Sequence, residues 1–267
     1  IADHPQATLG QEVASEFGDL PFLLKVLSAG QSLSIQAHPN KAQAAQLHRT
    51  DPEHYPDDNH KPEIAIALDH LTALMGFKPY PVFVRTLSRY PELSAFLGRE
   101  LVTRAACADQ SSDVVQATTI REVFATLVQR ASESPDDLGA AVDALARRLT
   151  AGFERTDEAE QRFLRLRERY GNQDIGLFAL LLFNVVHLEP GEAIYIDAGV
   201  PHAYLEGNIV ECMANSDNVV RVGLTPKFRD AKALLRIIDT RPRLPEILDG
   251  NPTPIDDGTT IATYEVP

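Results

Sequence analysis

The strongest constraint on the fold is a change of hydrophobic period along the chain. Residues 33–38 (LSIQAH) alternate with a period of two, and residues 63–69 (EIAIALD) put three large apolar side chains on one face; both patterns are typical of β-strands. Between residues 79 and 183 the period is helical. After residue 184 short strands return, separated by glycine, proline and asparagine at spacings typical of antiparallel barrels or jelly rolls. We therefore predict a mainly β protein with a helical insertion.

The helical insertion carries recognisable start signals. Ser134 precedes a proline and two acidic residues, which predicts an N-cap. Thr119 and Glu122 match a capping box ahead of IREVFATLVQR. Residues 157–170 predict a charged amphipathic helix. Two further helices are predicted outside the insertion, over residues 41–49 and 228–238.

Composition narrows the class of protein. The 267 residues are 44% hydrophobic and 24% charged, and no apolar run approaches the ~20 residues that cross a bilayer, so we expect no membrane partner. The net charge of -13 would repel a phosphate backbone, so we expect no nucleic acid either. Two cysteines and no signal peptide pattern indicate the reducing cytoplasm. The chain begins with Ile1 and ends in a strand-like stretch, so we leave open whether it is part of a longer protein.

Polar side chains share faces of the predicted strands. Residues two apart in a strand point the same way, so Ser34, Gln36 and His38 project together. The same geometry puts Lys61 and Glu63 on one face, and the turn in DAGVPHAYLEG presents His202 at the start of a strand. Two imidazoles, a carboxylate and an amide suit Zn²⁺, with Mn²⁺, Fe²⁺ and Co²⁺ as alternatives. Spacing alone leaves alternatives to metal binding open. Gln36 and His38 could lie on an exposed strand face, Glu63 could form a salt bridge, and His202 could be a hydrogen-bonded loop histidine.

Four longer motifs carry a resemblance. They are QAHPNK, HKPEIAIAL, DAGVPHAYLEG and VECMANSDNVVRVGLTPKF. In their order and form they resemble the motifs of the type I mannose-6-phosphate isomerases, also called phosphomannose isomerases, of the cupin superfamily. The resemblance implies a cupin-type jelly-roll β-barrel plus an all-α domain. The barrel would comprise residues 1–78 and 184–267, interrupted by a helical domain at 79–183, with a second cupin-like domain starting near 255–267. From the same resemblance, we expect the given sequence to lack the family's leading strands.

The resemblance also implies roles for individual residues. One zinc ion per chain would be held by Gln36, His38, Glu63 and His202. Arg221, Lys61 and Asp217 match active-site positions to which we assign catalytic roles. Four further positions, which we assign to substrate binding, are Ser34, Lys227, Glu211 and Tyr204.

The activity that the resemblance implies is the interconversion of mannose 6-phosphate and fructose 6-phosphate. A proton leaves the carbon beside a carbonyl, an enediolate forms, and the proton returns to the neighbouring carbon. Lys61, Arg221 and Lys227 would attract the phosphosugar despite the negative net charge. The group that transfers the proton is left open among His60, Lys61, Asp217, Glu211 and a metal-bound water. We favour Lys61 or Asp217, with Arg221 stabilising the enediolate.

Two other functions compete with this one, namely a cupin that binds a sugar phosphate without converting it and an Fe²⁺ cupin that activates oxygen. An amide ligand and basic neighbours favour a charged substrate over oxygen chemistry. We expect a monomer.

Overall fold

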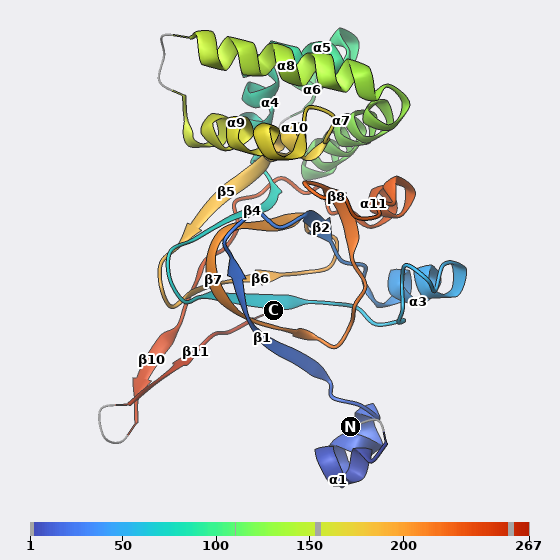
Figure 1. Cartoon of the computed structure of the whole chain (residues 1–267), viewed down its shortest axis with the longest axis vertical. Helices are drawn as coiled ribbons and strands as arrows, with labels where there is room; N and C mark the ends of the chain where they lie inside the picture. The colour runs from blue at the N-terminus through green and yellow to red at the C-terminus, as the bar shows by residue number, and fades with distance from the viewer. Residues whose placement is uncertain (1–2, 110, 153–155, 256–258, 267) are drawn as a thin grey trace.

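The computed structural model describes residues 3–109, 111–152, 156–255 and 259–266. Its centre is a large, curled antiparallel sheet with helices gathered at one end (Figure 1). The coarse prediction of a β protein with a helical insertion is confirmed. Among the described residues, no helix is both long and apolar enough to cross a bilayer.

The main sheet runs in the order β5-β4-β7-β3-β6-β9, while β1 and β2 also pair with β7, and β8 pairs with β2. Every pairing is antiparallel. The strands are β1 (Phe22–Ala29), β2 (Ile35–Ala37), β3 (Glu63–Ala67), β4 (Leu71–Phe77), β5 (Phe183–Leu188), β6 (Glu192–Ile196), β7 (His202–Ala214), β8 (Val220–Gly223) and β9 (Leu248–Asp249).

Strand β7 organises the sheet because it is long and bends. Its first half pairs with β2 and β4, and its second half pairs with β1 and β3. The pairing partners change at Gly207, whose φ is 125°. A Cβ at that position would lie 2.6 Å from the carbonyl oxygen of His70, so glycine is required on both conformational and steric grounds. One strand thereby reaches both sides of the curl.

Seven helices described between β4 and β5 pack over one end of the sheet (Figure 1). They are α4 (Tyr80–Arg89), α5 (Pro91–Leu97), α6 (Arg99–Cys107), α7 (Asp113–Glu133), α8 (Pro135–Ala151), α9 (Glu158–Tyr170) and α10 (Gly176–Leu182). Helices outside this group are α1 (Pro5–Leu9), α2 (Gln11–Phe17), α3 (Lys41–Thr50) and α11 (Ala231–Ile237).

Two apolar cores lie on opposite faces of the sheet. The larger joins the helices to Ile35, Ala37 and Ala203. The smaller fills the inside of the curl and includes Ala65 and Tyr204. Because Ala203 and Tyr204 are consecutive in β7, their side chains enter different cores. Polar side chains that share the inner face, such as that of Glu63, are therefore enclosed.

One predicted capping box is wrong, and one predicted N-cap is only partly right. Helix α7 begins at Asp113 with Ser112 as its N-cap, so Thr119 lies inside the helix and donates to the carbonyl of Val115. Ser134 does precede α8, but its side chain makes no capping hydrogen bond. The helix after Ser112 was missed because short apolar and polar residues alternate there without a clear period.

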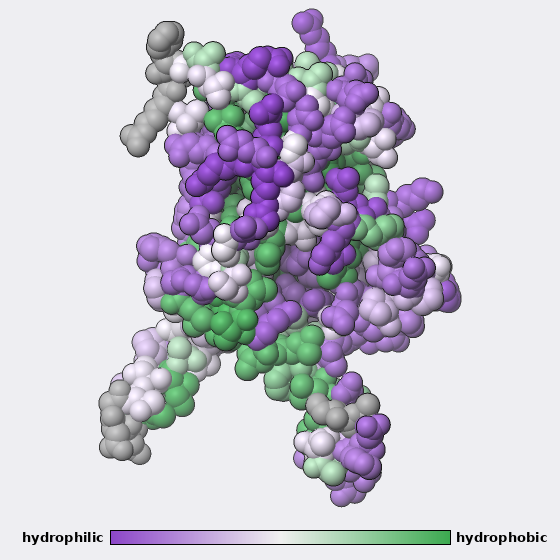
Figure 2. Space-filling view, viewed as in Figure 1, coloured by the Kyte–Doolittle hydropathy of each residue, from purple (hydrophilic) through white to green (hydrophobic). Residues whose placement is uncertain are grey.

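Two parts of the chain extend from the body at the end opposite the helices. One is the N-terminal pair α1 and α2, and the other is the hairpin of β10 (Asn251–Pro254) and β11 (Thr260–Thr263) (Figure 1). The predicted start of a second cupin-like domain falls on this hairpin and partly outside the described residues. Figure 2 shows apolar surface along β1, where Leu24 and Val26 are 63% and 72% exposed.

Candidate metal centre

Three separated segments meet at the inner face of the sheet. Gln36 in β2 is the register partner of His202, the first residue of β7, and Glu63 begins β3 beside them. The turn before β7 is closed by Gly199, whose N–H donates to the carbonyl of His38 at 2.8 Å. Gly199 has a φ of 78°, which glycine adopts without strain. The predicted turn at Gly199 and the strand start at His202 are both confirmed.

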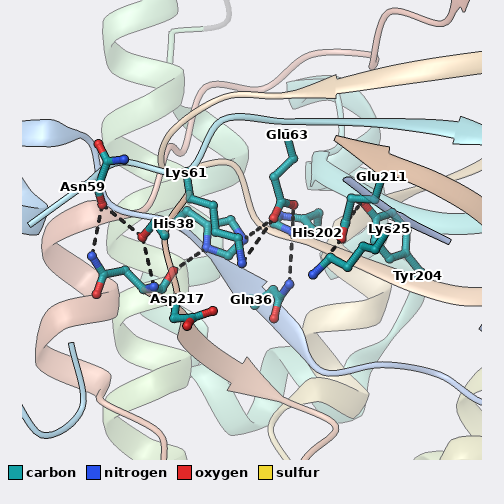
Figure 3. A network of polar contacts seen from close by, with 12 residues as sticks. Lys25, Gln36, His38, Asn59, Lys61, Glu63, His202, Tyr204, Glu211 and Asp217 are labelled. Carbon is teal, nitrogen blue, oxygen red and sulfur yellow. Dashed lines mark hydrogen bonds and ion pairs between the residues drawn. The ribbon is translucent and has the colours of Figure 1, made fainter. Parts of the chain in front are cut away.

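The side chains from these segments converge (Figure 3). His38 Nε2 lies 3.4 Å from Glu63 Oε1, and His202 Nε2 lies 3.4 Å from Glu63 Oε2. All three side chains are at most 2% exposed, and one ligand atom from each lies within 4.8 Å of the others. Gln36 joins them, with its Nε2 atom 3.4 Å from His202 Nε2. The predicted shared face of Gln36 and His38 is therefore present.

Backbone carbonyls fix the tautomer of both imidazoles. His38 Nδ1 lies 2.7 Å from the carbonyl oxygen of Asn218, and His202 Nδ1 lies 2.9 Å from that of Val200. Since a carbonyl oxygen only accepts, each Nδ1 carries the proton. In a neutral imidazole the Nε2 atom then presents a lone pair. Both lone pairs thus point at the Glu63 carboxylate.

Burial and hydrogen bonding set the charge of this cluster. Burial lowers the pKa of His38 below its ordinary value, which the neighbouring Glu63 opposes. Burial alone would raise the pKa of Glu63, but the adjacent His202 and His38 outweigh it and hold the pKa of this carboxyl well below its ordinary value. A neutral His38 beside an ionised Glu63 is the resulting state.

This arrangement fits a metal ion. His38 Nε2 and Glu63 Oε2 are buried without a hydrogen-bond partner in the described part of the chain, and such groups are costly unless something satisfies them. A cation between two imidazole lone pairs and a carboxylate would do so, and turning the Gln36 amide over would add an oxygen ligand. Two neutral nitrogen ligands and one anionic ligand leave a divalent ion with net positive charge.

Further predicted residues surround the cluster. Lys61 is buried, and its Nζ atom lies 3.7 Å from Glu63 Oε1. Ser34 Oγ lies 3.5 Å from Gln36 Oε1. The Tyr204 hydroxyl donates to Glu211 at 2.9 Å, and burial followed by the charge of Glu211 raises the tyrosine pKa.

Sequence reasoning missed Lys25, whose Nζ atom lies 3.4 Å from Glu211 Oε2. The two residues are register partners across β1 and β7. No pattern in a single sequence pairs those strands, so nothing in the sequence signalled this contact.

Three predicted residues lie outside the cluster of contacting side chains. Asp217 and Lys227 are exposed. Arg221 is half-buried in β8 and is a register partner of Gln36, and it lines a cleft of about 200 Å³ together with Arg229 from the loop before α11. The catalytic and substrate roles of these residues stay predictions.

The fold and the cluster together define a class, namely a curled antiparallel β-sheet protein with a buried candidate metal centre. Residues 1–80 match the family "Phosphomannose isomerase type I, catalytic domain". The chain is 40% identical to a mannose-6-phosphate isomerase of Rattus norvegicus over 264 residues, which is 98% of this chain. It is 43% identical to one of Candida albicans over an alignment of 260 positions that covers 89% of this chain. The resemblance to the type I phosphomannose isomerases is thereby confirmed.

Solved structures agree with this relationship. A mutant phosphomannose isomerase of Salmonella typhimurium superposes with a TM-score of 0.72 at 32% identity, covering 96% of this chain and 64% of the other. A mannose 6-phosphate isomerase bound with zinc and yttrium superposes with a TM-score of 0.71 at 32% identity, covering 96% of this chain and 65% of the other. The chain spans 62% of the rat relative and 56% of the Candida relative.

Proposed function

We propose that the protein is a zinc-dependent aldose-ketose isomerase that interconverts mannose 6-phosphate and fructose 6-phosphate. The observation that carries the proposal is the convergence of His38 Nε2, His202 Nε2 and Glu63 within 4.8 Å, with both Nδ1 atoms committed to backbone carbonyls. The relatives' names and a zinc-bound neighbour support the same reaction and metal.

In this proposal, Gln36, His38, Glu63 and His202 hold one zinc ion per chain. When bound, zinc supplies Lewis acidity that polarises the sugar oxygens. The ligand set matches that task, because a single carboxylate leaves positive charge uncancelled. The reaction moves a proton from the carbon beside the carbonyl to its neighbour through an enediolate, so no oxidant or reductant is consumed.

Lys61 is better supported than Asp217 as the group that transfers the proton. A base must approach within about 3 Å of the proton it takes, directly or through one water. Lys61 Nζ lies 3.7 Å from Glu63 in the buried centre, whereas Asp217 is exposed. We retain Arg221 as the group that stabilises the enediolate, and Ser34, Lys227, Glu211 and Tyr204 as substrate-binding residues.

The first experiment measures conversion of mannose 6-phosphate to fructose 6-phosphate before and after chelation, with zinc then added back. Loss with the chelator and recovery with zinc is the expected result. A Glu63→Gln variant should lose activity by at least about 100-fold, since even the outer partners of metal ligands cost 10–100-fold. Glu189→Gln is the matched control, because Glu189 is an exposed carboxylate whose one ion-pair partner among the described residues is His70.

The competing function is a cupin that binds a sugar phosphate without converting it. It predicts tight binding with no exchange of the substrate's C2 hydrogen into solvent. Zinc-replete protein that binds the phosphosugar, yet neither converts it nor exchanges this hydrogen, would overturn the isomerase.

We infer that the curled sheet is a cupin-type jelly-roll barrel formed by residues 1–78 and 184–267, with 79–183 as its helical domain. A cytoplasmic location and a monomeric state stay predictions.

A further inference from the structure

We propose that Asp57 is a positioning residue that holds the loop of residues 216–218 and thereby orients the ring of His38. Asp57 precedes β3 in the segment YPDDNHKPE, six residues before Glu63. The inference rests on the proposed metal centre and adds a residue that supports it from outside.

The Asp57 carboxylate is saturated with donors from this loop. Oδ1 accepts from Ser216 Oγ at 2.8 Å and from Asn218 Nδ2 at 2.9 Å, while Oδ2 accepts from the Asp217 N–H at 2.8 Å. Oδ1 also accepts from the Asn59 N–H at 2.9 Å. Within the described residues no lysine, arginine or histidine pairs with Asp57, so hydrogen bonds alone compensate its charge.

The loop held by Asp57 ends at the atom that fixes His38. The carbonyl oxygen of Asn218 lies 2.7 Å from His38 Nδ1, and both residues are at most 1% exposed. Asp57 thus acts indirectly, because its carboxylate holds the side chain of Asn218 while the backbone carbonyl of Asn218 holds the imidazole of His38. Such outer partners set both the tautomer and the ring orientation of a metal-binding histidine.

The loop does not depend on Asp57 for its existence. Asn218 Nδ2 also donates to the Asn59 carbonyl at 3.0 Å, and Asn59 Nδ2 donates to the Asn215 carbonyl at 3.0 Å. Removing the charge of Asp57 should therefore loosen the loop without unfolding it. In an Asp57→Asn variant one oxygen becomes an NH₂ group, which must face at least one of the present donors.

The test compares Asp57→Asn with Asp58→Asn. The second variant makes the same chemical change one residue away, at a side chain that is 66% exposed and that pairs, in the described part of the chain, only with Lys41 at 3.7 Å. Zinc affinity is measured by chelator competition. We expect about 10–100-fold weaker binding for Asp57→Asn, the range typical of outer partners, and less than about a twofold change for Asp58→Asn.

A second readout needs no metal and no turnover. In metal-free protein, ¹H–¹⁵N correlation spectra report which nitrogen of His38 carries the proton. Asp57→Asn should shift or broaden the Nδ1–H signal, whereas Asp58→Asn should leave it unchanged. A Ser216→Ala variant, which removes one donor to Asp57, should produce a smaller effect of the same kind and serves if Asp57→Asn does not fold.

Unchanged His38 signals, or equal loss of zinc affinity in both variants, would overturn the role of Asp57. These outcomes differ from failure of the proposed function, because wild-type protein that binds zinc but converts no phosphosugar overturns the isomerase and leaves the positioning test intact.

Discussion

At the scale of single residues, the buried cluster makes stability depend on pH. Burial lowers the pKa of His38 below 6.5 in the folded protein, whereas the unfolded chain keeps the ordinary value. As the pH falls through 6.5, the unfolded chain binds a proton that the folded chain does not, which favours unfolding. Below 4.5 the depressed pKa of Glu63 acts in the same direction. The free energy of unfolding of metal-free protein should therefore decline in two stages as the pH is lowered.

Urea titrations at a series of pH values measure this dependence. His38→Gln should flatten the profile between pH 6.5 and 4.5, since the group that titrates there is gone. His70→Gln is the control, because the His70 side chain is 75% exposed. An identical slope for wild type and His38→Gln would contradict the prediction.

The sequence predicts contacts within one strand better than contacts between strands or in loops. Gln36 and His38, or Lys61 and Glu63, are two apart, so strand geometry alone assigns them to one face. Contacts between strands need the pairing register, which is why the ion pair of Lys25 with Glu211 was missed. The orientation of a loop side chain has no periodicity at all, and Asp217, expected at the centre, is exposed.

At the scale of the element, two helix starts show how much a capping hydrogen bond contributes to stability. The Asn40 side chain accepts from the N–H of Gln43, whose side chain accepts in turn from the Asn40 N–H, so α3 has a complete capping box. Asn40→Ala should lower the free energy of unfolding by about 1 kcal/mol. Ser134→Ala should change it by only a few tenths of a kcal/mol, because Ser134 occupies the cap position of α8 without making the bond.

Chemical denaturation of both variants measures the two differences. Asn40→Ser, which retains a capping oxygen, should recover most of the loss. Equal effects of Asn40→Ala and Ser134→Ala would show that residue type at the cap, rather than the hydrogen bond, determines the stabilisation.

The same contrast explains which elements the sequence predicts. Helices α3 and α9 have strong caps and clear periodicity, and they begin within a residue of the predicted positions. Helix α7 begins among Ser, Thr and Val residues that favour caps and strands as readily as helices, and its start at Asp113 was not predicted. Tertiary packing of Ile120, Val123 and Phe124 stabilises this helix, and packing is not visible in local sequence.

At the scale of the whole molecule, the helical region and the sheet share a core. Phe124 of α7 lies 5.3 Å from Phe77 at the end of β4 and 6.0 Å from Phe183 at the start of β5, measured between ring centroids. Phe77 and Phe183 are themselves 4.9 Å apart, and all three rings are fully buried. The chain leaves the sheet and returns to it at these two residues, so the rings close the junction through which the insertion is connected.

This shared core predicts that residues 79–183 unfold together with the sheet, although the sequence marks them as a separate helical segment. Phe124→Ala should lower the free energy of unfolding by roughly 3–5 kcal/mol. The loss of helix is measured by far-UV circular dichroism, and the loss of sheet is measured by the NMR signals of β3 and β7. Both transitions should move to the same lower urea concentration. Coincident transitions are the mark of one cooperative unit. Val114→Ala is the control, because Val114 lies in the same helix and is 76% exposed. If Phe124→Ala moved only the helical transition and left the sheet signals in place, the helices would be an independent domain and the aromatic junction a contact surface between two folding units.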